Sequence, residues 1–175
     1  MQRIVIRTAK EKDVEALVAM RLELMEHVLE SDPAASRVSE RGREAVRPEI
    51  IARLKEDTNF LAIAETEDGT LVGMALAEMI ANIYRVPDAF GHIHWLYVRP
   101  EFRRNGIAAR LVRVICEFFK EWNLREITVG FVARNREAAV FWRALGFSPR
   151  IVHANIALDL LVEKSDRHCD SFEKS

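Results

Sequence analysis

An apolar segment that runs through a turn containing arginine and glycine into an amphipathic helix constrains the fold of this chain most. It comprises residues 94–111, HWLYVRPEFRRNGIAARL. A strand that leads directly into a helix is typical of α/β folds. The turn leaves the first N–H groups of the helix without partners at the positive end of its dipole, where a phosphate oxygen can accept from them. We therefore expect an α/β fold with an anion site at this turn.

The residues of the turn support this interpretation. Gly106 lets the main chain approach a ligand without a Cβ in the way, and Ala108 keeps the next helical turn thin. Arg103 and Arg104 supply charge that phosphates can share. The alternative is a solvated charge pair at the start of a helix, but the glycine and the helix start favour phosphate binding.

Size and charge balance limit the class of protein. The 175 residues, 49% of them hydrophobic, can bury a core and are expected to form one domain. The net charge is −1, so we expect neither nucleic acid nor a membrane as a partner. Apolar runs are shorter than the ~20 residues of a spanning helix and no signal-peptide core is present, which predicts a cytoplasmic location. No metal is expected, because neither cysteine has a cysteine partner at metal-ligand spacing.

Strands and helices alternate along the chain. Thr8 to Glu11 form a capping-box pattern before a helix that ends near Leu29, and Asn135 and Gly146 are suited to begin and end a later helix. Asp68-Gly69 predicts a hairpin. The other expected elements are a helix at Asn105–Trp122 and strands at Arg3–Arg7, Phe60–Ala64, Leu71–Ile80, His92–Val98, Ile127–Val132 and within Ile151–Leu161.

Two polar segments break these patterns. Residues 31–47, SDPAASRVSERGREAVR, are expected to form a loop that leads to a short helix near Pro48–Glu56. From Glu163 onward the chain is polar and is expected to be frayed.

The order of these elements resembles that of the GNAT superfamily of N-acetyltransferases, over about Ile4 to Leu161. The strongest match is Leu96-Tyr-Val-Arg-Pro-Glu-Phe-Arg-Arg-Asn-Gly-Ile-Ala108, which fits the family's strand, proline and R/Q-x-x-G-x-G/A turn. The further matches are Ile6-Arg-Thr-Ala with Asp13, and Asn135, Ala138, Phe141 and Leu145-Gly146-Phe147.

The resemblance implies a fold and a domain organisation. The expected fold is α/β, with a central mixed and strongly twisted β-sheet of about six to seven strands flanked by about four α-helices. A single N-acetyltransferase domain would span residues 1–162, and residues 163–175 would be a polar C-terminal tail. Homodimers are common in the family, so a homodimer is possible.

The resemblance also implies acetyl-coenzyme A as the cofactor. The amides of residues 104–108, with the two arginines, would hold its pyrophosphate, and the strand would bond the pantetheine arm in a gap between two splayed parallel strands. Asn135 would contact the pantetheine from the other side, and Phe141 would line the thioester end. The implied cofactor-binding residues are Leu96, Tyr97, Val98, Arg103, Arg104, Asn105, Gly106, Ile107, Ala108, Asn135 and Phe141.

An amine that attacks the thioester directly must first lose a proton, and three residues could accept it. His92, at the position where several family members carry a glutamate base, is the first candidate, His94 the second and Glu78 a weaker third. Each histidine could instead be a structurally satisfied residue. Strand alternation places Trp95 and Tyr97 on the core face and both histidines on the other face unless a bulge intervenes.

Trp142 departs from the family pattern, because many members carry a tyrosine there that can protonate the departing thiolate. An indole cannot transfer a proton, so it is expected to line the substrate pocket, while another group or water protonates the thiolate or it leaves unprotonated. We expect an N-acetyltransferase that acetylates a primary amine, either a small molecule or a protein amino group, selected by segments 31–57 and 81–91. The alternative is a non-catalytic acyl-coenzyme A sensor or interaction module.

Overall fold

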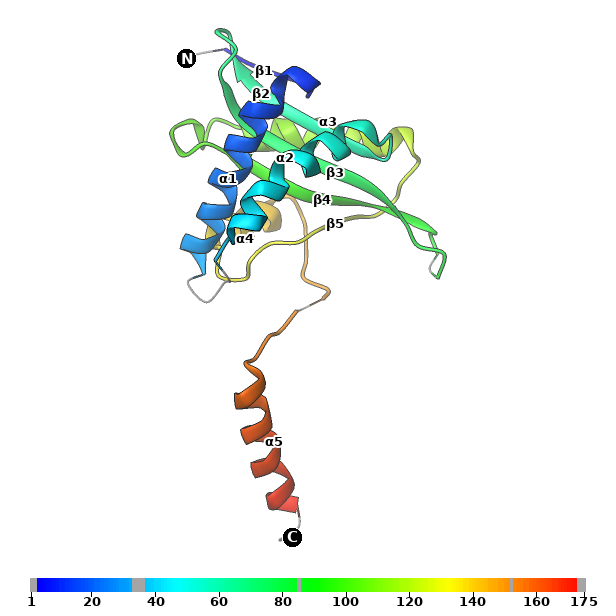
Figure 1. Cartoon of the computed structure of the whole chain (residues 1–175). Helices are drawn as coiled ribbons and strands as arrows, with labels where there is room; N and C mark the ends of the chain where they lie inside the picture. Colours follow the sequence, from blue (N-terminus) through cyan, green and yellow to red (C-terminus); the bar gives the residue numbers. More distant parts are fainter. Residues whose placement is uncertain (1–2, 33–36, 85, 152, 173–175) are drawn as a thin grey trace. The chain divides into compact units, whose positions relative to one another are not determined.

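The computed structural model describes residues 3–32, 37–84, 86–151 and 153–172, which fall into two compact units, residues 1–139 and 140–175. The first unit contains a five-stranded sheet in the order β1-β2-β3-β4-β5 (Figure 1). The first four strands are antiparallel, whereas β4 and β5 are parallel, so the expected mixed α/β sheet is confirmed with five strands. The strands are β1 (Ile4–Thr8), β2 (Asn59–Thr66), β3 (Leu71–Ala81), β4 (Ala89–Val98) and β5 (Ile127–Val129).

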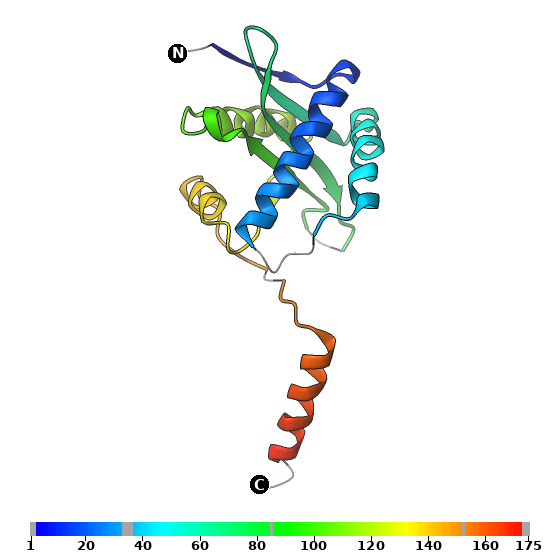
Figure 2. The same ribbon diagram turned by 60° about the vertical axis from the view of Figure 1, so that its left-hand side comes forward.

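Helices cover both faces of this sheet (Figure 1, Figure 2). Helices α1 (Val14–Ser31) and α2 (Glu40–Lys55) pack on one face, and α3 (Ile107–Glu121) packs on the other. The α3 pattern predicted from sequence is confirmed, because its apolar side is buried while its charged side is exposed. The core beneath α1 and α2 is formed by Leu17, Met20, Val46, Ile50, Ile63, Met74, Leu76, Trp95 and Tyr97.

The entry to α1 differs from the predicted capping box. Thr8 is the last residue of β1, and a short 3-10 turn at Glu11–Asp13 precedes the helix. Asp13, rather than Glu11, accepts the Lys10 N–H at 2.8 Å, and Arg7 holds the same carboxylate at 2.7 Å. The strand thus extends to the predicted cap residue and moves the capping interaction two residues along the chain.

The loop predicted for residues 31–47 is wrong over its second half. Helix α2 begins at Glu40, and the Ser39 hydroxyl caps it by accepting the Gly42 N–H at 3.0 Å. Only Val46 and Ile50 are fully buried on this helix, so its sequence has the polarity of a loop. Pro48 lies inside the helix on its exposed side, where solvent can satisfy the carbonyl that the missing N–H would bond. Residues 33–36 of the predicted loop lie outside the described residues.

The regular secondary structure described after β5 consists of helices. Asn135 accepts the Ala138 N–H at 3.0 Å at the start of α4 (Arg136–Ala144), and Gly146, at φ 91°, donates to the Arg143 carbonyl at 2.9 Å, which confirms both predicted helix ends. The strand predicted within Ile151–Leu161 is wrong, because the described residues before Leu158 are irregular and helix α5 (Leu158–Phe172) begins there. The frayed end predicted from Glu163 is helical as far as Phe172, and the residues after it lie outside the described part of the chain. Short apolar runs do not distinguish strand from helix.

Gly91 is required where β4 meets β5, which gives a test of the packing. A Cβ built on Gly91 would lie 2.5 Å from the buried ring of Phe119. Gly91→Ala should therefore lower the free energy of unfolding by about 1–3 kcal/mol in denaturant titrations, as overpacked cores do. Gly130→Ala is the matched control, because its Cβ would meet nothing within 4 Å. Equal losses in the two variants would contradict this account.

Candidate active site

Strands β4 and β5 separate partway along their length. Their pairing covers only Gly91 to Ile93 against Ile127 to Val129, after which β5 ends while β4 continues through residues 94–98 (Figure 1). The Arg99 N–H points to β3, where it donates to the Val72 carbonyl at 2.9 Å. Because N–H groups alternate sides along a strand, those of Leu96 and Val98 face the opening left by β5. The opening between the two strands is thus lined by main-chain donors.

The turn after β4 is open to an anion at the start of α3. Arg104 and Gly106 both have left-handed backbone, at φ 61° and 72°. The main-chain N–H of Arg110 donates to the Gly106 carbonyl at 3.0 Å and makes the first intrahelical hydrogen bond. The amides of residues 106–109 therefore have no partner within the helix. Gly106 has no side chain to cap them, and a Cβ there would meet nothing within 4 Å. The predicted amides therefore lie together at an accessible helix start.

The two arginines of the turn have different surroundings. Arg103 donates to the Val98 carbonyl at 3.0 Å and to Glu137 at 2.8 Å, and its guanidinium lies 5.8 Å from the centre of the Tyr97 ring. Arg104 is exposed and makes no ion pair within the part of the chain that the structure describes. Arg104 is thus available to a ligand, whereas Arg103 fastens the turn to β4 and to the first turn of α4.

A β-bulge in β4 decides where the histidines point. Trp95 pairs with Leu76 and Ile93 with Ala77, so His94 is an extra residue in β4. His94 contacts Glu78, which binds Arg53 of α2, and Trp95 lies beneath Arg21 of α1. The bulge that the sequence analysis left open is therefore present, and the histidines share the helix-covered face with Trp95.

The three predicted proton acceptors lie together on this face. His94 Nε2 is 2.6 Å from Glu78 Oε2, and the rings of His92 and His94 are 4.6 Å apart between centroids. Arg53, which the sequence analysis missed, donates to the same Glu78 oxygen at 2.7 Å and to Asn59 at 3.1 Å. Its position one helical turn after Ile50, inside the helix predicted at Pro48–Glu56, was the available signal, but a helical pattern alone does not show which polar residue faces the sheet.

The Thr128 hydroxyl lies against His92 Nδ1. The two atoms are 2.7 Å apart, and the same hydroxyl is 3.3 Å from the Gly91 carbonyl. When the hydroxyl donates its one proton to Gly91, it accepts from His92 and Nδ1 carries the proton. In that tautomer the lone pair of His92 is on Nε2, the ring nitrogen that can then accept a proton.

Electrostatics give His92 and Glu78 different properties. Burial, together with the nearby His94, lowers the pKa of His92 below its ordinary value although Glu78 opposes this, so the ring is neutral at neutral pH. Burial alone would raise the pKa of Glu78, but hydrogen bonds from His94 and Arg53 outweigh it and hold that pKa below its ordinary value. Glu78 is consequently a paired carboxylate and a weak base, whereas His92 is a neutral acceptor.

Trp142 belongs to an aromatic cluster in the second unit. Its side chain is 4% exposed, and its ring centre lies 5.0 Å from that of Phe141 and 5.1 Å from that of Phe147. The Phe147 N–H also donates to the Trp142 carbonyl at 3.0 Å. These contacts hold the tryptophan in place within this unit.

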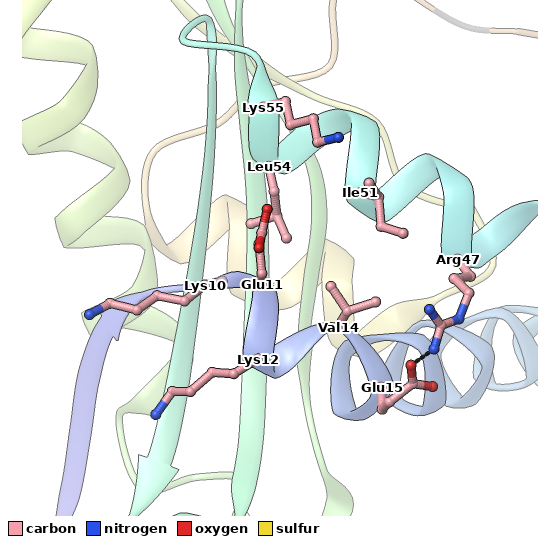
Figure 3. A pocket seen from close by; sticks show the side chains of 10 residues that line it. Lys10, Glu11, Lys12, Val14, Glu15, Arg47, Ile51, Leu54 and Lys55 are labelled. Atoms are coloured by element: carbon pink, nitrogen blue, oxygen red, sulfur yellow. Dashed lines mark ion pairs between the residues drawn. The ribbon is translucent and has the colours of Figure 1, made fainter.

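A surface hollow of about 500 Å³ lies elsewhere, between the start of α1 and the C-terminal half of α2 (Figure 3). Val14, Ile51 and Leu54 form its apolar part, and an ion pair between Arg47 and Glu15 closes one side. It contains none of the predicted site residues.

In the described ranges no helix is long and apolar enough to cross a membrane.

A mixed sheet in which β5 ends while β4 continues, beside an accessible helix start, defines an α/β protein with main-chain donors suited to an anion. The sequence profile of the acetyltransferase (GNAT) family matches residues 22–147. The chain belongs to this family of acetyltransferases.

Solved structures share this fold at low sequence identity. A tetramutant of the BH1408 protein from Bacillus halodurans has a TM-score of 0.77 and 16% identity, over 88% of this chain and 99% of that one. A predicted acetyltransferase from Clostridium acetobutylicum, solved with acetyl-CoA, has a TM-score of 0.70 and 20% identity, over 89% and 97%. An aminoglycoside 6′-N-acetyltransferase from Acinetobacter baumannii has a TM-score of 0.66 and 18% identity, over 89% and 99%.

The lowered pKa of His92 predicts how stability depends on pH. Between the folded-state pKa and the ordinary value of 6.5, the unfolded chain holds a proton that the folded chain does not. The free energy of unfolding should therefore fall as the pH drops below 6.5, and it should fall less in His92→Asn, which has no titrating ring. Urea titrations at several pH values measure this, and NMR titration of the ring reads the pKa directly. A His92 midpoint at or above 6.5 would contradict the prediction.

Proposed function

We propose that this chain transfers an acetyl group from acetyl-coenzyme A to a primary amine. The observation that carries the proposal is the opening between β4 and β5, which has the accessible helix start of α3 near one end and neutral His92 near the other. When bound, acetyl-coenzyme A supplies an activated acyl group as a thioester.

The chain's main-chain donors suit the two polar parts of such a donor. The amides of residues 106–109, with Arg104, would bind the pyrophosphate. The N–H groups of Leu96 and Val98 would bond the extended pantetheine arm, and that of Val98 would also stabilise the oxyanion that forms when the amine attacks. Asn135 and Phe141 remain proposed contacts. Arg103 would position the turn through Val98 and Glu137 and need not hold the phosphates itself.

The proposed base is His92, acting through Nε2. Thr128 orients the ring and Glu78 holds the neighbouring His94, so a proton taken from the amine would reside on His92. His94 is the second candidate. Trp142 remains a proposed substrate contact, and the thiolate would leave unprotonated or take its proton from water. A non-catalytic acyl-coenzyme A sensor would show the same cofactor binding without transfer, so measured turnover on any amine excludes it.

Cofactor binding is tested at Gly106. We expect Gly106→Glu to abolish binding of acetyl-coenzyme A in calorimetry, because it adds a side chain and a negative charge at the helix start. Gly69→Glu is the matched control, since Gly69 also has left-handed backbone, at φ 85°, and open space around its Cβ, but lies in the β2–β3 hairpin. Both variants should lose about 1–2 kcal/mol of stability through backbone strain. Unchanged affinity in folded Gly106→Glu would contradict the pyrophosphate site.

The base is tested by the pH dependence of kcat/KM, with thiol release as the readout. His92→Asn can keep the contact with Thr128 but lacks Nε2, so we expect kcat/KM to fall about 10²- to 10⁴-fold near pH 7. The loss should shrink at high pH, where more of the amine is already deprotonated. His153→Asn, at an exposed histidine, is the control. If His92→Asn keeps the wild-type profile, His92 is not the base, and the same comparison with His94→Asn decides the second candidate.

A further inference from the structure

Arg21 of α1 is a charged group on the buried side of its helix. It follows Met20, which is fully buried, and its guanidinium carbon lies 4.5 Å from the centre of the Trp95 ring. Its Nε is buried and has no hydrogen-bond partner among the described residues. A buried N–H without a partner is costly, and more so on a cation, so such groups are uncommon unless a ligand, an ion or a water molecule satisfies them.

Three other arginines on this side of the sheet are paired. Arg53 meets Glu78 at 2.7 Å, Arg99 meets Glu23 at 2.8 Å, and Arg103 meets a carboxylate at 2.8 Å. Arg21 has no carboxylate within ion-pair distance in the described ranges. Burial lowers the pKa of Arg21, and the more distant Glu49 only partly offsets this, but a guanidinium stays charged.

This unpaired charge lies close to the proposed base. Trp95 directly follows His94 in β4, and the bulge places both side chains on the face that α1 and α2 cover. Successive strand residues are ~3.3 Å apart, so Arg21 lies within a few strand steps of His92. A molecule whose amine reaches His92 could therefore present a second group to Arg21, with its connecting carbons against the indole of Trp95.

We propose that the amine acceptor also carries a carboxylate, which Arg21 binds, so that the substrate class is amino acids or related amino carboxylates. The proposal rests on the proposed acetyltransferase function. A carboxylate would satisfy the buried N–H and pair the free charge in one contact. A polycationic aminoglycoside, the substrate class named for one relative of similar fold, would instead bring ammonium groups toward an unpaired guanidinium.

The test compares pairs of acceptors that differ only in carboxylate or carboxamide. Glycine, β-alanine, 4-aminobutyrate, 5-aminopentanoate and L-leucine are assayed beside their amides, with acetyl-coenzyme A as donor and rates corrected for the free-amine fraction. Wild type should favour the acid of at least one pair roughly 10- to 100-fold in kcat/KM, the range of a charge-assisted hydrogen bond. No preference for any acid would overturn the proposal without any variant being needed.

Substitutions then assign the preference to Arg21. Arg21→Gln should remove it, mainly by raising KM for the acid. Arg21→Lys keeps the charge, so it should retain part of the preference for the acid. It replaces the glutamine variant as the test if that variant does not fold. Arg113→Gln, at an exposed arginine of α3, is the control. An undiminished acid preference in Arg21→Gln would overturn the proposal.

A binding measurement separates this proposal from the proposed function. If no amine is acetylated, 4-acetamidobutyrate and its amide are titrated calorimetrically into the protein with coenzyme A present. Tighter binding of the acid that is lost in Arg21→Gln supports the carboxylate site even though transfer fails. If no amine is acetylated, equal or absent binding of the two probes overturns the carboxylate site.

Discussion

The additional residue in β4 is the constraint on which the arrangement of the site depends. With regular alternation, His92 and His94 would lie on the opposite face from Trp95 and Tyr97. The bulge at His94 shifts the alternation, so that the proton acceptors and the aromatic residues share the face beneath α1 and α2. The face under α3 remains apolar, because Gly91 and Ile93 turn toward that helix. One inserted residue thus separates a polar site from a dry core within the same strand.

Several charged side chains on the polar face of the sheet are held in ion pairs, so a charged side chain without such a pair is informative. Glu78 is shared between Arg53 and His94, and Arg103 is committed to Val98 and Glu137. These contacts hold side chains that would otherwise be mobile at a half-exposed site. Arg104 at the start of α3 and Arg21 above Trp95 make no ion pair in the described part of the chain. One is exposed and one is buried, which suits them to different ligand groups.

The sequence predicted those parts of the fold that depend on local patterns. The apolar period of α3, the Asp68-Gly69 hairpin and the caps at Asn135 and Gly146 each act over a few residues, and each is confirmed. The sequence indicated only the second half of α2, because only two of its side chains are fully buried, and it did not reveal the helical C-terminal segment, where the apolar spacing fits both strand and helix. Tertiary contacts decide such cases.

Prediction of the site was limited for a related reason. The turn around Gly106 has a local signature, whereas the bulge depends on how β3 pairs with β4, which a single strand does not encode. Arg21 and Arg53 are polar residues on helices, and a helical pattern alone does not show which polar residues face inward. The inward positions of Arg21 and Arg53 depend on how α1 and α2 pack on the sheet.

Thr128 links two properties of the site that could otherwise vary independently. It belongs to the short stretch of β5 that pairs with β4, so it helps define where the strands part, and its hydroxyl also contacts His92 Nδ1. Under the proposed function, a chain that drew β5 away to admit a bulkier acyl group would lose the contact that orients the ring. Breadth of acyl-donor specificity and orientation of the proposed base would then be in opposition, and redesign of one would require a new partner for His92 Nδ1.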